Sequence, residues 1–300
     1  MANRSLLLSA GIIFIPVAAL LGSLGIGHIL LKGTDKHQIQ SKYTAVLSAQ
    51  AASKKQSLAL EVKPVAPTPV IFSVPEEFRG TVTSQIQPRV EDKVIALTFD
   101  DGPAPKYTQQ ILEILKQENI KATFFCVGEM VHYFPQLAKQ EVAEGHVIGN
   151  HTWHHWLQKM NSQVAANEIE STATAIFEAT GVKTSLFRPP YGALNNGVAD
   201  YAKKNNYAVL MWSDDSQDYR RPSVARVVNN VLREAKPGGM VLMHDGGGNR
   251  TQTVAALPKI IANLKQQGYR FVTVPQLLAI QAQKATLTTV TPSHQPNQGT

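Results

Sequence analysis

The 300-residue chain has a single cysteine, Cys126, so no disulfide can form within it. Cys126 lies in the apolar run ATFFCVG, where we expect a small buried hydrophobic residue. A basic patch is missing from the central part: residues 94–280 hold 18 Lys or Arg against 16 Asp or Glu, although the whole chain has a net charge of +7. This near balance excludes nucleic acid as an expected partner. Internal repeats and any sign of an obligate protein partner are also missing.

The amino-terminal segment, residues 6–31, contains no formal charge and follows Arg4. About 20 apolar residues span a bilayer, so residues 1–31 are predicted to form a cytoplasmic end and a transmembrane anchor. A signal peptide has a shorter apolar core and a small-residue cleavage site. No A-x-A ends this run, although Gly and Ser between positions 22 and 27 keep a cleaved signal as the alternative. Charge does not set the orientation, because basic residues also follow the segment, at Lys32, Lys36 and Lys42.

Two further segments have compositions typical of irregular structure. Residues 32–93 are rich in Lys, Gln, Ser, Ala and Pro, and the prolines at 64, 67 and 69 favour an extended spacer. We therefore predict a flexible stalk there, with a small accessory subdomain as the alternative. Residues 281–300 are rich in Thr, Gln and Pro and are predicted to form a disordered tail. The remaining residues, 94–280, form the predicted catalytic domain.

Within residues 94–280, apolar runs typical of buried strands alternate with amphipathic helical segments. We predict strands at 94–99, 122–127, 146–149, 185–187, 208–212, 239–243 and 270–274. We predict helices at 108–118, 162–180, 195–205, 224–235 and 254–267. Seven strands that alternate with helices imply an α/β fold in which a parallel sheet closes, or nearly closes, into a barrel.

Chemically active side chains follow five of the predicted strands. The clearest example is VIALTFDDGP, where a buried strand ends in Asp100 and Asp101 before a Gly-Pro break. Because a βα barrel places its active site at the carboxyl ends of its strands, we expect all five clusters to meet on one face. The other clusters are His151 and His155 in GNHTWHH, Arg188 in FRPPYG, Asp214, Asp215 and Asp218 in WSDDSQDY, and His244 and Asp245 in VLMHDG.

The spacing of the histidines predicts a metal site. Residues four apart lie on one face of a helix, so His151 and His155 could bind one ion together with an aspartate, and His154 is the competing partner. Such a site keeps positions open for water and substrate. The other aspartate would remain free as a base, which Arg188 could hold ionised, and His244 would supply a second group for proton transfer.

The motifs TFDDGP, HTWHH, RPPYG, DSQDY and LMHD resemble, in order and spacing, the five motifs of the NodB-homology polysaccharide deacetylases, carbohydrate esterase family four. The resemblance covers about residues 94–280 and implies a distorted (β/α)7 TIM-like barrel. It also implies one divalent metal ion, with zinc expected first and cobalt, nickel or manganese as alternatives. The implied metal ligands are Asp101, His151 and His155.

The same resemblance implies roles for the remaining motif residues. Asp100 would be the catalytic base, held by Arg188, and His244 the general acid, tuned by Asp218. The groups that bind substrate would be the Tyr191 N–H for the oxyanion and Leu242 for the acetyl methyl. The fourth motif of the family usually ends Asp-Trp, whereas this chain has Tyr219 after Asp218, which predicts a looser acetyl pocket or a different substrate.

These residues predict a metal-dependent hydrolase that removes N-acetyl groups from N-acetylglucosamine units and releases acetate. An anchored enzyme would face outside, in the periplasm or cell wall, with peptidoglycan favoured as the acetylated glycan; it would be secreted if the amino-terminal segment is cleaved. An O-acetyl esterase acting on acetylated xylan is the alternative, because the same groups would serve. An inactive glycan-binding barrel would be expected to lack a ligand, base or acid, and none is missing. The aromatic rings of Trp153, Trp156 and Tyr191 could stack on sugars or belong to the core.

Overall fold

The computed structural model of the chain describes Ala45, Ser48, Ala49, residues 70–88 and residues 92–290. The chain divides into two units, Met1–Ala66 and Pro67–Thr300. In the first unit the three described residues are helical, and the predicted anchor at 6–31 lies outside the described residues. Among the residues that are described, no helix combines the length and the apolar character needed to cross a bilayer.

The second unit is built around β3 (Val94–Asp100), whose seven residues are all buried. Its apolar run does not alternate with polar residues because both of its faces are covered, as expected for a central parallel strand. β3 pairs in parallel with β4 (Thr123–Cys126) on one side and β10 (Gly239–His244) on the other. β11 (Arg270–Phe271) pairs with the first two residues of β3. Asp100 therefore ends a strand that is buried along its whole length.

Among the described residues, the main sheet has nine strands, and every strand pair in it is parallel. The strand order is β2-β8-β7-β5-β4-β3-β10-β9. β8 lies beside one edge and β9 forms the other edge, yet only residues 211–213 join them, so the sheet must curl towards a barrel. The strands not yet placed are β2 (Val82–Thr83), β5 (Val147–Asn150), β7 (Leu186–Phe187), β8 (Ala208–Leu210) and β9 (Asp214–Asp215).

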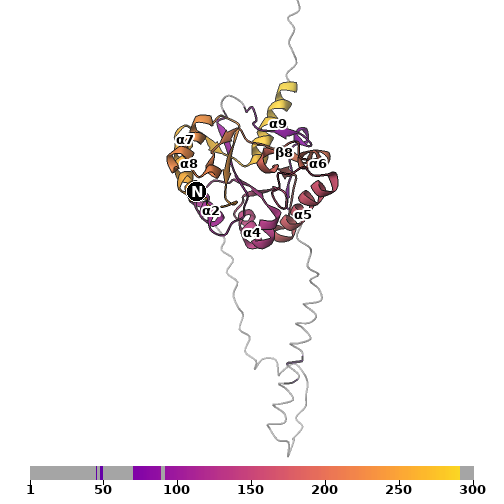
Figure 1. Cartoon of the computed structure of the whole chain (residues 1–300). Helices are drawn as coiled ribbons and strands as arrows, with labels where there is room; N and C mark the ends of the chain where they lie inside the picture. The colour runs from indigo at the N-terminus through magenta and orange to yellow at the C-terminus, as the bar shows by residue number, and fades with distance from the viewer. Residues whose placement is uncertain (1–44, 46–47, 50–69, 89–91, 291–300) are drawn as a thin grey trace, which may run out of the picture. The chain divides into compact units, whose positions relative to one another are not determined.

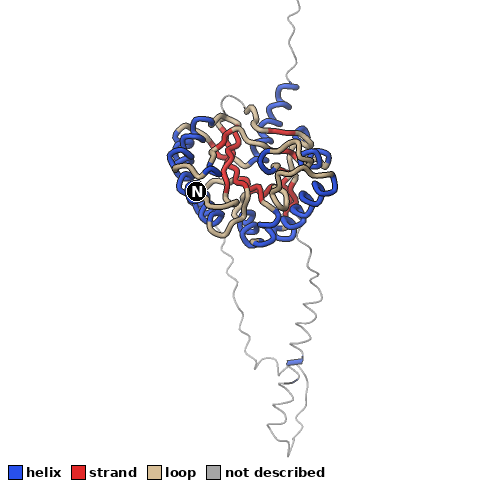
Figure 2. The backbone as a smooth tube through the Cα atoms, viewed as in Figure 1, coloured by secondary structure: helices blue, strands red, loops and turns tan. Residues whose placement is uncertain are grey.

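Helices surround the strands, which gather in the middle of this unit (Figures 1 and 2). α5 illustrates how the sequence sets their limits: it begins after Asn161, whose side chain accepts a hydrogen bond from the Val164 N–H, and ends at Gly181 in a left-handed conformation. The helices are α2 (Tyr107–Gln117), α3 (Gly128–Tyr133), α4 (Pro135–Ala143), α5 (Ser162–Thr180), α6 (Val198–Lys204), α7 (Val224–Glu234), α8 (Thr251–Gln266) and α9 (Val274–Val290).

The predicted class, an α/β fold with a parallel sheet, is confirmed, and each of the seven predicted strand runs contains a strand. The predicted start of the domain at residue 94 is wrong. β1 (Val70–Phe72) pairs with β6 (Val182–Thr184), and β2 pairs with β8, so residues 70–88 belong to the fold rather than to a stalk. These strands are too short to produce a sequence signal, and they form only by pairing with partners more than 100 residues away.

The predicted tail is also partly wrong, because α9 continues to Val290 through residues assigned to disorder. Its first part contributes Leu277 and Leu278 to the core, which holds the beginning of the helix on the barrel. Residues 291–300 and the remainder of the predicted stalk lie outside the described residues.

Candidate active site

A cleft of about 660 Å³ opens where the five motif clusters meet. The carboxyl ends of β3 and β10 lie side by side at its floor, because His244 is in register with Asp100. The convergence that was predicted from strand ends is therefore observed. The residues that line the cleft are Asp100, Asp101, Val127, Glu129, Met130, His151, His154, His155, Pro189, Tyr191, Trp212, Tyr219, Leu242, His244, Gly247 and Arg250.

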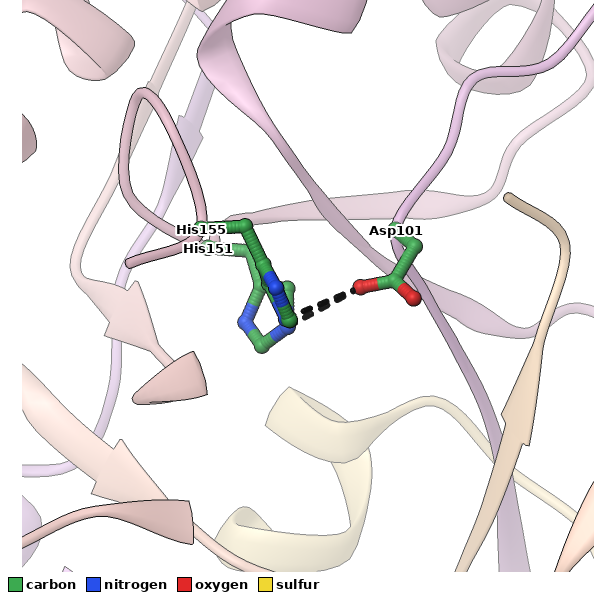
Figure 3. A group of neighbouring side chains, drawn as sticks. All are labelled: Asp101, His151 and His155. Carbon is green, nitrogen blue, oxygen red and sulfur yellow. Dashed lines mark ion pairs between the residues drawn. The ribbon is translucent and has the colours of Figure 1, made fainter. Parts of the chain in front are cut away.

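One carboxylate oxygen faces two imidazole rings at the centre of the cleft (Figure 3). Asp101 Oδ1 lies 3.1 Å from His155 Nε2 and 3.5 Å from His151 Nε2. The three side chains offer one ligand atom each, and these atoms lie within 4.8 Å of one another. Asp101 Oδ1 is buried and has no hydrogen-bond partner among the described residues. A buried carboxylate oxygen in this state is costly without a cation, so the residues present fit a divalent metal ion held by two His and one Asp.

The two histidines converge through a loop, so the prediction of one helical face is wrong. Thr152 and His155 both adopt positive φ angles, 65° and 59°, which turn the chain back on itself. Residue spacing alone cannot reveal such a turn, because it requires left-handed residues that are not glycine. The Asp101 backbone is also left-handed, with φ 75°, and this directs its side chain towards the histidines.

The backbone sets which nitrogen of His151 faces the aspartate. His151 Nδ1 lies 2.7 Å from the carbonyl oxygen of Arg188, so Nδ1 carries the proton and donates it there. The lone pair of Nε2 then points towards Asp101, as required of a metal ligand. Burial lowers the pKa of His155 to about 4, and the neighbouring His151 adds to this shift. His155 is thus a neutral ring, ready to donate a lone pair.

His154 is not the second histidine of the cluster. Its Nδ1 pairs with the Glu168 carboxylate, and its ring stacks on Trp156 with centroids 4.0 Å apart. Glu168 also accepts hydrogen bonds from the backbone N–H groups of Trp153 and His154, so one buried carboxylate organises the whole loop. Trp153 contacts His132 and does not line the cleft, whereas the exposed Trp156 stacks beside its rim.

Asp100 is held from behind by a buried arginine. Arg188 Nη1 donates to Asp100 Oδ1 at 2.8 Å and to Thr98 Oγ1 at 2.7 Å. The guanidinium is fully buried, and it also donates to the carbonyl oxygens of Leu210 and Met211. Because four of its five N–H groups donate to fixed partners, Arg188 locks the orientation of Asp100. The free oxygen, Asp100 Oδ2, lies 3.8 Å from His151 Nε2 and faces the cleft.

A second carboxylate, that of Asp218, pairs with His244 on the other side of the cleft floor. Asp218 Oδ1 is 2.7 Å from His244 Nδ1, and Asp218 Oδ2 accepts from the His244 N–H and from Thr253 Oγ1. Burial alone would lower the pKa of His244, but the charge of Asp218 and its hydrogen bond outweigh burial and raise that pKa to about 9. His244 is therefore a protonated group whose Nε2 is left for the cleft.

The predicted substrate-binding residues lie on the walls of the cleft. Tyr191 has a left-handed backbone, with φ 57°, and the residue is 63% exposed; the centroid of its ring lies 4.5 Å from that of His155. Leu242 is buried in β10 and presents an apolar side chain to the cavity. Tyr219 lies at the rim, where its hydroxyl donates to Asp215 and its ring is 5.7 Å from that of His244. An aromatic ring thus lies beside His244 despite the absence of the expected tryptophan.

Four of the aspartates named in the motif clusters do not line the cleft: Asp214, Asp215, Asp218 and Asp245. Asp214 is buried in β9, and burial raises its pKa to about 7. Asp245 is buried below the floor and accepts a hydrogen bond from Thr108 Oγ1. Several residues that line the cleft were not predicted, among them Arg250 and Trp212. Trp212 is the first residue of the motif WSDDSQDY, whereas Arg250 had no signal beyond its place after a glycine run.

Comparison with known proteins agrees with this geometry. The polysaccharide deacetylase family profile matches residues 87–210. A peptidoglycan-N-acetylglucosamine deacetylase of Bacillus cereus is 47% identical over 189 residues, which cover 62% of this chain and 89% of the relative. The peptidoglycan-N-acetylmuramic acid deacetylase PdaC of Bacillus subtilis is 36% identical, covering 75% of this chain and 45% of the relative.

Solved structures give the same result. The crystal structure of a peptidoglycan N-acetylglucosamine deacetylase, bound to a hydroxamate, aligns with a TM-score of 0.63 and 38% identity, covering 67% of this chain and 94% of that chain. A pseudoenzyme of carbohydrate esterase family four from Bacillus anthracis aligns with a TM-score of 0.61 and 32% identity, covering 66% of this chain and 69% of that chain. The chain therefore belongs to the polysaccharide deacetylases of carbohydrate esterase family four and is a hydrolase of that family.

Proposed function

We propose that the chain is a metal-dependent N-deacetylase that acts on N-acetylglucosamine units of peptidoglycan and releases acetate. One observation carries this proposal: a base held by arginine, an acid held by aspartate and an Asp-His-His cluster face a single cleft. The similarity to enzymes named as peptidoglycan deacetylases supports the choice of polymer.

The base would be Asp100. Its Oδ1 is occupied by Arg188, so Oδ2 is the oxygen that can accept a proton from the attacking water. Because Arg188 fixes Asp100, the carboxylate does not have to reorient during the reaction, and this lowers the activation barrier. Arg188 therefore acts through Asp100 and does not contact the substrate itself.

The acid would be His244. Its Nδ1 is engaged by Asp218, so its Nε2 proton is the one that can pass to the departing nitrogen. A sugar amine leaves readily only once it is protonated, and a histidine with a pKa near 9 holds its proton at neutral pH. This match favours amide cleavage over ester cleavage, where the leaving alkoxide has less need of a pre-formed cationic acid.

The residues on the walls of the cleft match the chemistry of an acetamide group. Leu242 offers an apolar surface for the acetyl methyl, and we assign the Tyr191 N–H to the developing oxyanion. Tyr219 would close the pocket from the rim, leaving it looser than a tryptophan would.

Asp101, His151 and His155 would hold the metal, for which we propose one zinc ion because two imidazoles and one carboxylate are a typical catalytic zinc set. Bound there, a divalent ion would acidify water and polarise the acetyl oxygen, which complements the base and the acid supplied by the chain.

We also propose that residues 1–31 anchor the enzyme to the membrane and that the catalytic domain faces outside. This proposal is supported by the uncharged run at 6–31 and by the extracytoplasmic location of peptidoglycan. Cleavage of that segment, which would release the enzyme, is the alternative outcome. Proteolytic mapping of the mature amino terminus in membrane and soluble fractions would separate the two.

Acetate release from N-acetylglucosamine oligomers and from O-acetylated xylan tests the chemistry. The zinc-loaded protein should release acetate from the oligomers, and His244→Ala, with equal metal loading, should lose this activity. Release from acetylated xylan alone would replace the proposal with the esterase. Binding of the oligomers without release from either substrate would identify an inactive barrel, the condition of the Bacillus anthracis pseudoenzyme.

A further inference from the structure

The glycine loop, residues 246–248, packs directly against the proposed metal ligand Asp101. A Cβ on Gly246 would lie 2.0 Å from the Asp101 carbonyl oxygen, and a Cβ on Gly247 would lie 2.3 Å from Asp101 Oδ2. Gly247 also has a φ of +67°, which disfavours a side chain. The loop thus covers both the backbone and the carboxylate of Asp101.

One buried arginine holds this loop in place. Arg250 Nε donates to the Gly246 carbonyl oxygen at 2.6 Å, and Nη2 donates to the Gly247 carbonyl oxygen at 3.1 Å. The residue is 4% exposed, and its guanidinium lines the cleft. A planar fork with fixed donors suits such a double backbone contact, which lysine could not reproduce.

The same guanidinium faces the oxygen of Asp101 that the histidines leave free. Arg250 Nη2 lies 3.8 Å from Asp101 Oδ2, whereas Oδ1 faces His151 and His155. Within the described part of the chain, Arg250 is the only cationic side chain within 4.0 Å of Oδ2. The two carboxylate oxygens are thereby given different environments.

We propose that Arg250 is a positioning residue that makes Asp101 present a single oxygen, Oδ1, to the metal. It does so by fixing the glycine loop through hydrogen bonds and by facing Asp101 Oδ2. This inference rests on the proposed metal site. A carboxylate free to rotate could bind through both oxygens and fill a position that water or substrate needs. The arginine acts through Asp101 and does not belong to the reacting groups.

Zinc affinity of the metal-free protein, measured by competition with a chromophoric chelator, tests the inference. Loss of a group that orients a metal ligand typically weakens metal binding 10- to 100-fold, so we expect a shift of about that size for Arg250→Met. Arg250→Lys keeps the charge but not the double backbone contact and should recover only a small part of the loss. Arg226→Met, at an exposed position on α7, is the matched control and should bind as wild type.

Gly247→Ala provides a second variant that keeps the arginine side chain. Its Cβ would lie 2.3 Å from Asp101 Oδ2 and 3.1 Å from Arg250 Nη2, so it would push these two groups away from their positions and should also weaken zinc binding. The visible spectrum of the cobalt-loaded protein should change in both variants, since it reports ligand number and geometry. Circular dichroism of the metal-free forms identifies any variant that fails to fold.

The outcomes are distinct. Zinc binding by folded Arg250→Met within about twofold of wild type, with an unchanged cobalt spectrum, would overturn the inference. A rise in KM for the oligomers with unchanged zinc affinity would also overturn it, since Arg250 would then contact substrate. If Asp101→Ala binds zinc as tightly as wild type, the metal site itself is misplaced and the proposed function fails with it.

Discussion

Asp218→Asn should move the basic limb of the pH–rate profile. In the native protein Asp218 raises the pKa of His244 to about 9, against an ordinary value of 6.5. This difference corresponds to roughly 3 kcal/mol of preference for the protonated ring. Without the carboxylate charge, burial lowers the pKa of His244 and only the charges of Asp101 and Asp100 oppose it, so we expect the pKa to return to about its ordinary value of 6.5. The protonated share of His244 would then fall from about three quarters to about 1% at pH 8.5, but only about fourfold at pH 7.

The assay is kcat/KM for acetate release between pH 5 and 10, with wild type and variant at equal metal loading. We expect a loss on the order of 75-fold at pH 8.5 that shrinks below tenfold at pH 7, because only the fraction of protonated acid changes. Asp200→Asn, which removes an exposed carboxylate from its pair with Lys203, is the control and should leave the profile unchanged. A uniform loss at every pH, with the basic limb unmoved, would refute the reasoning.

The Asp218–His244 pair should also affect the free energy of unfolding. The raised pKa of His244 means that the folded state binds a proton more tightly than the unfolded state. The resulting stabilisation is fully present below about pH 6.5 and is lost as the pH rises through about 9. The difference in unfolding free energy between wild type and Asp218→Asn should therefore shrink over that window, as urea titrations at pH 6 and pH 9.5 would show.

The remaining predictions concern the first motif and its support. Asp100→Asn should abolish turnover and leave metal binding largely intact, whereas Asp101→Ala should lose both; near-native turnover by the first variant would show that the base is assigned wrongly. Arg188→Met should destabilise the metal-free protein by about 3–5 kcal/mol in urea unfolding, because it leaves the buried Asp100 without its partner. Gly102→Ala should cost about 1–3 kcal/mol, since its Cβ would lie 2.0 Å from Asp245 Oδ2; a stability equal to wild type would show that this floor is looser than described.

Sequence reasoning succeeded where one local signal sufficed. The unalternated run of β3 predicted a central strand because enclosure on both faces removes any need for polar residues. α5 was predicted with its observed limits, and in the structure Asn161 and Gly181 cap its two ends. The convergence of strand ends then followed from the barrel topology alone.

The features that were missed depend on contacts between distant segments. α3 and α4 are short and meet at Phe134, so neither shows a clear helical stripe. The HTWHH loop relies on Glu168, in another element, to hold its backbone. Arg250 comes close to Asp101 only when the glycine loop folds over that residue, and the spacing of residues in the sequence does not predict this contact.

The most direct test of the account is metal removal and add-back during acetate release from an N-acetylglucosamine oligomer. The full chain would be stripped with a chelator and then titrated with zinc, with His155→Ala as the control. We predict that activity disappears on stripping and returns in proportion to zinc, saturating at about one ion per chain, while the variant stays inactive under the same titration. Full activity in the stripped protein, or restoration of His155→Ala by the first equivalent of zinc, would contradict the assignment of Asp101, His151 and His155 as the catalytic metal site.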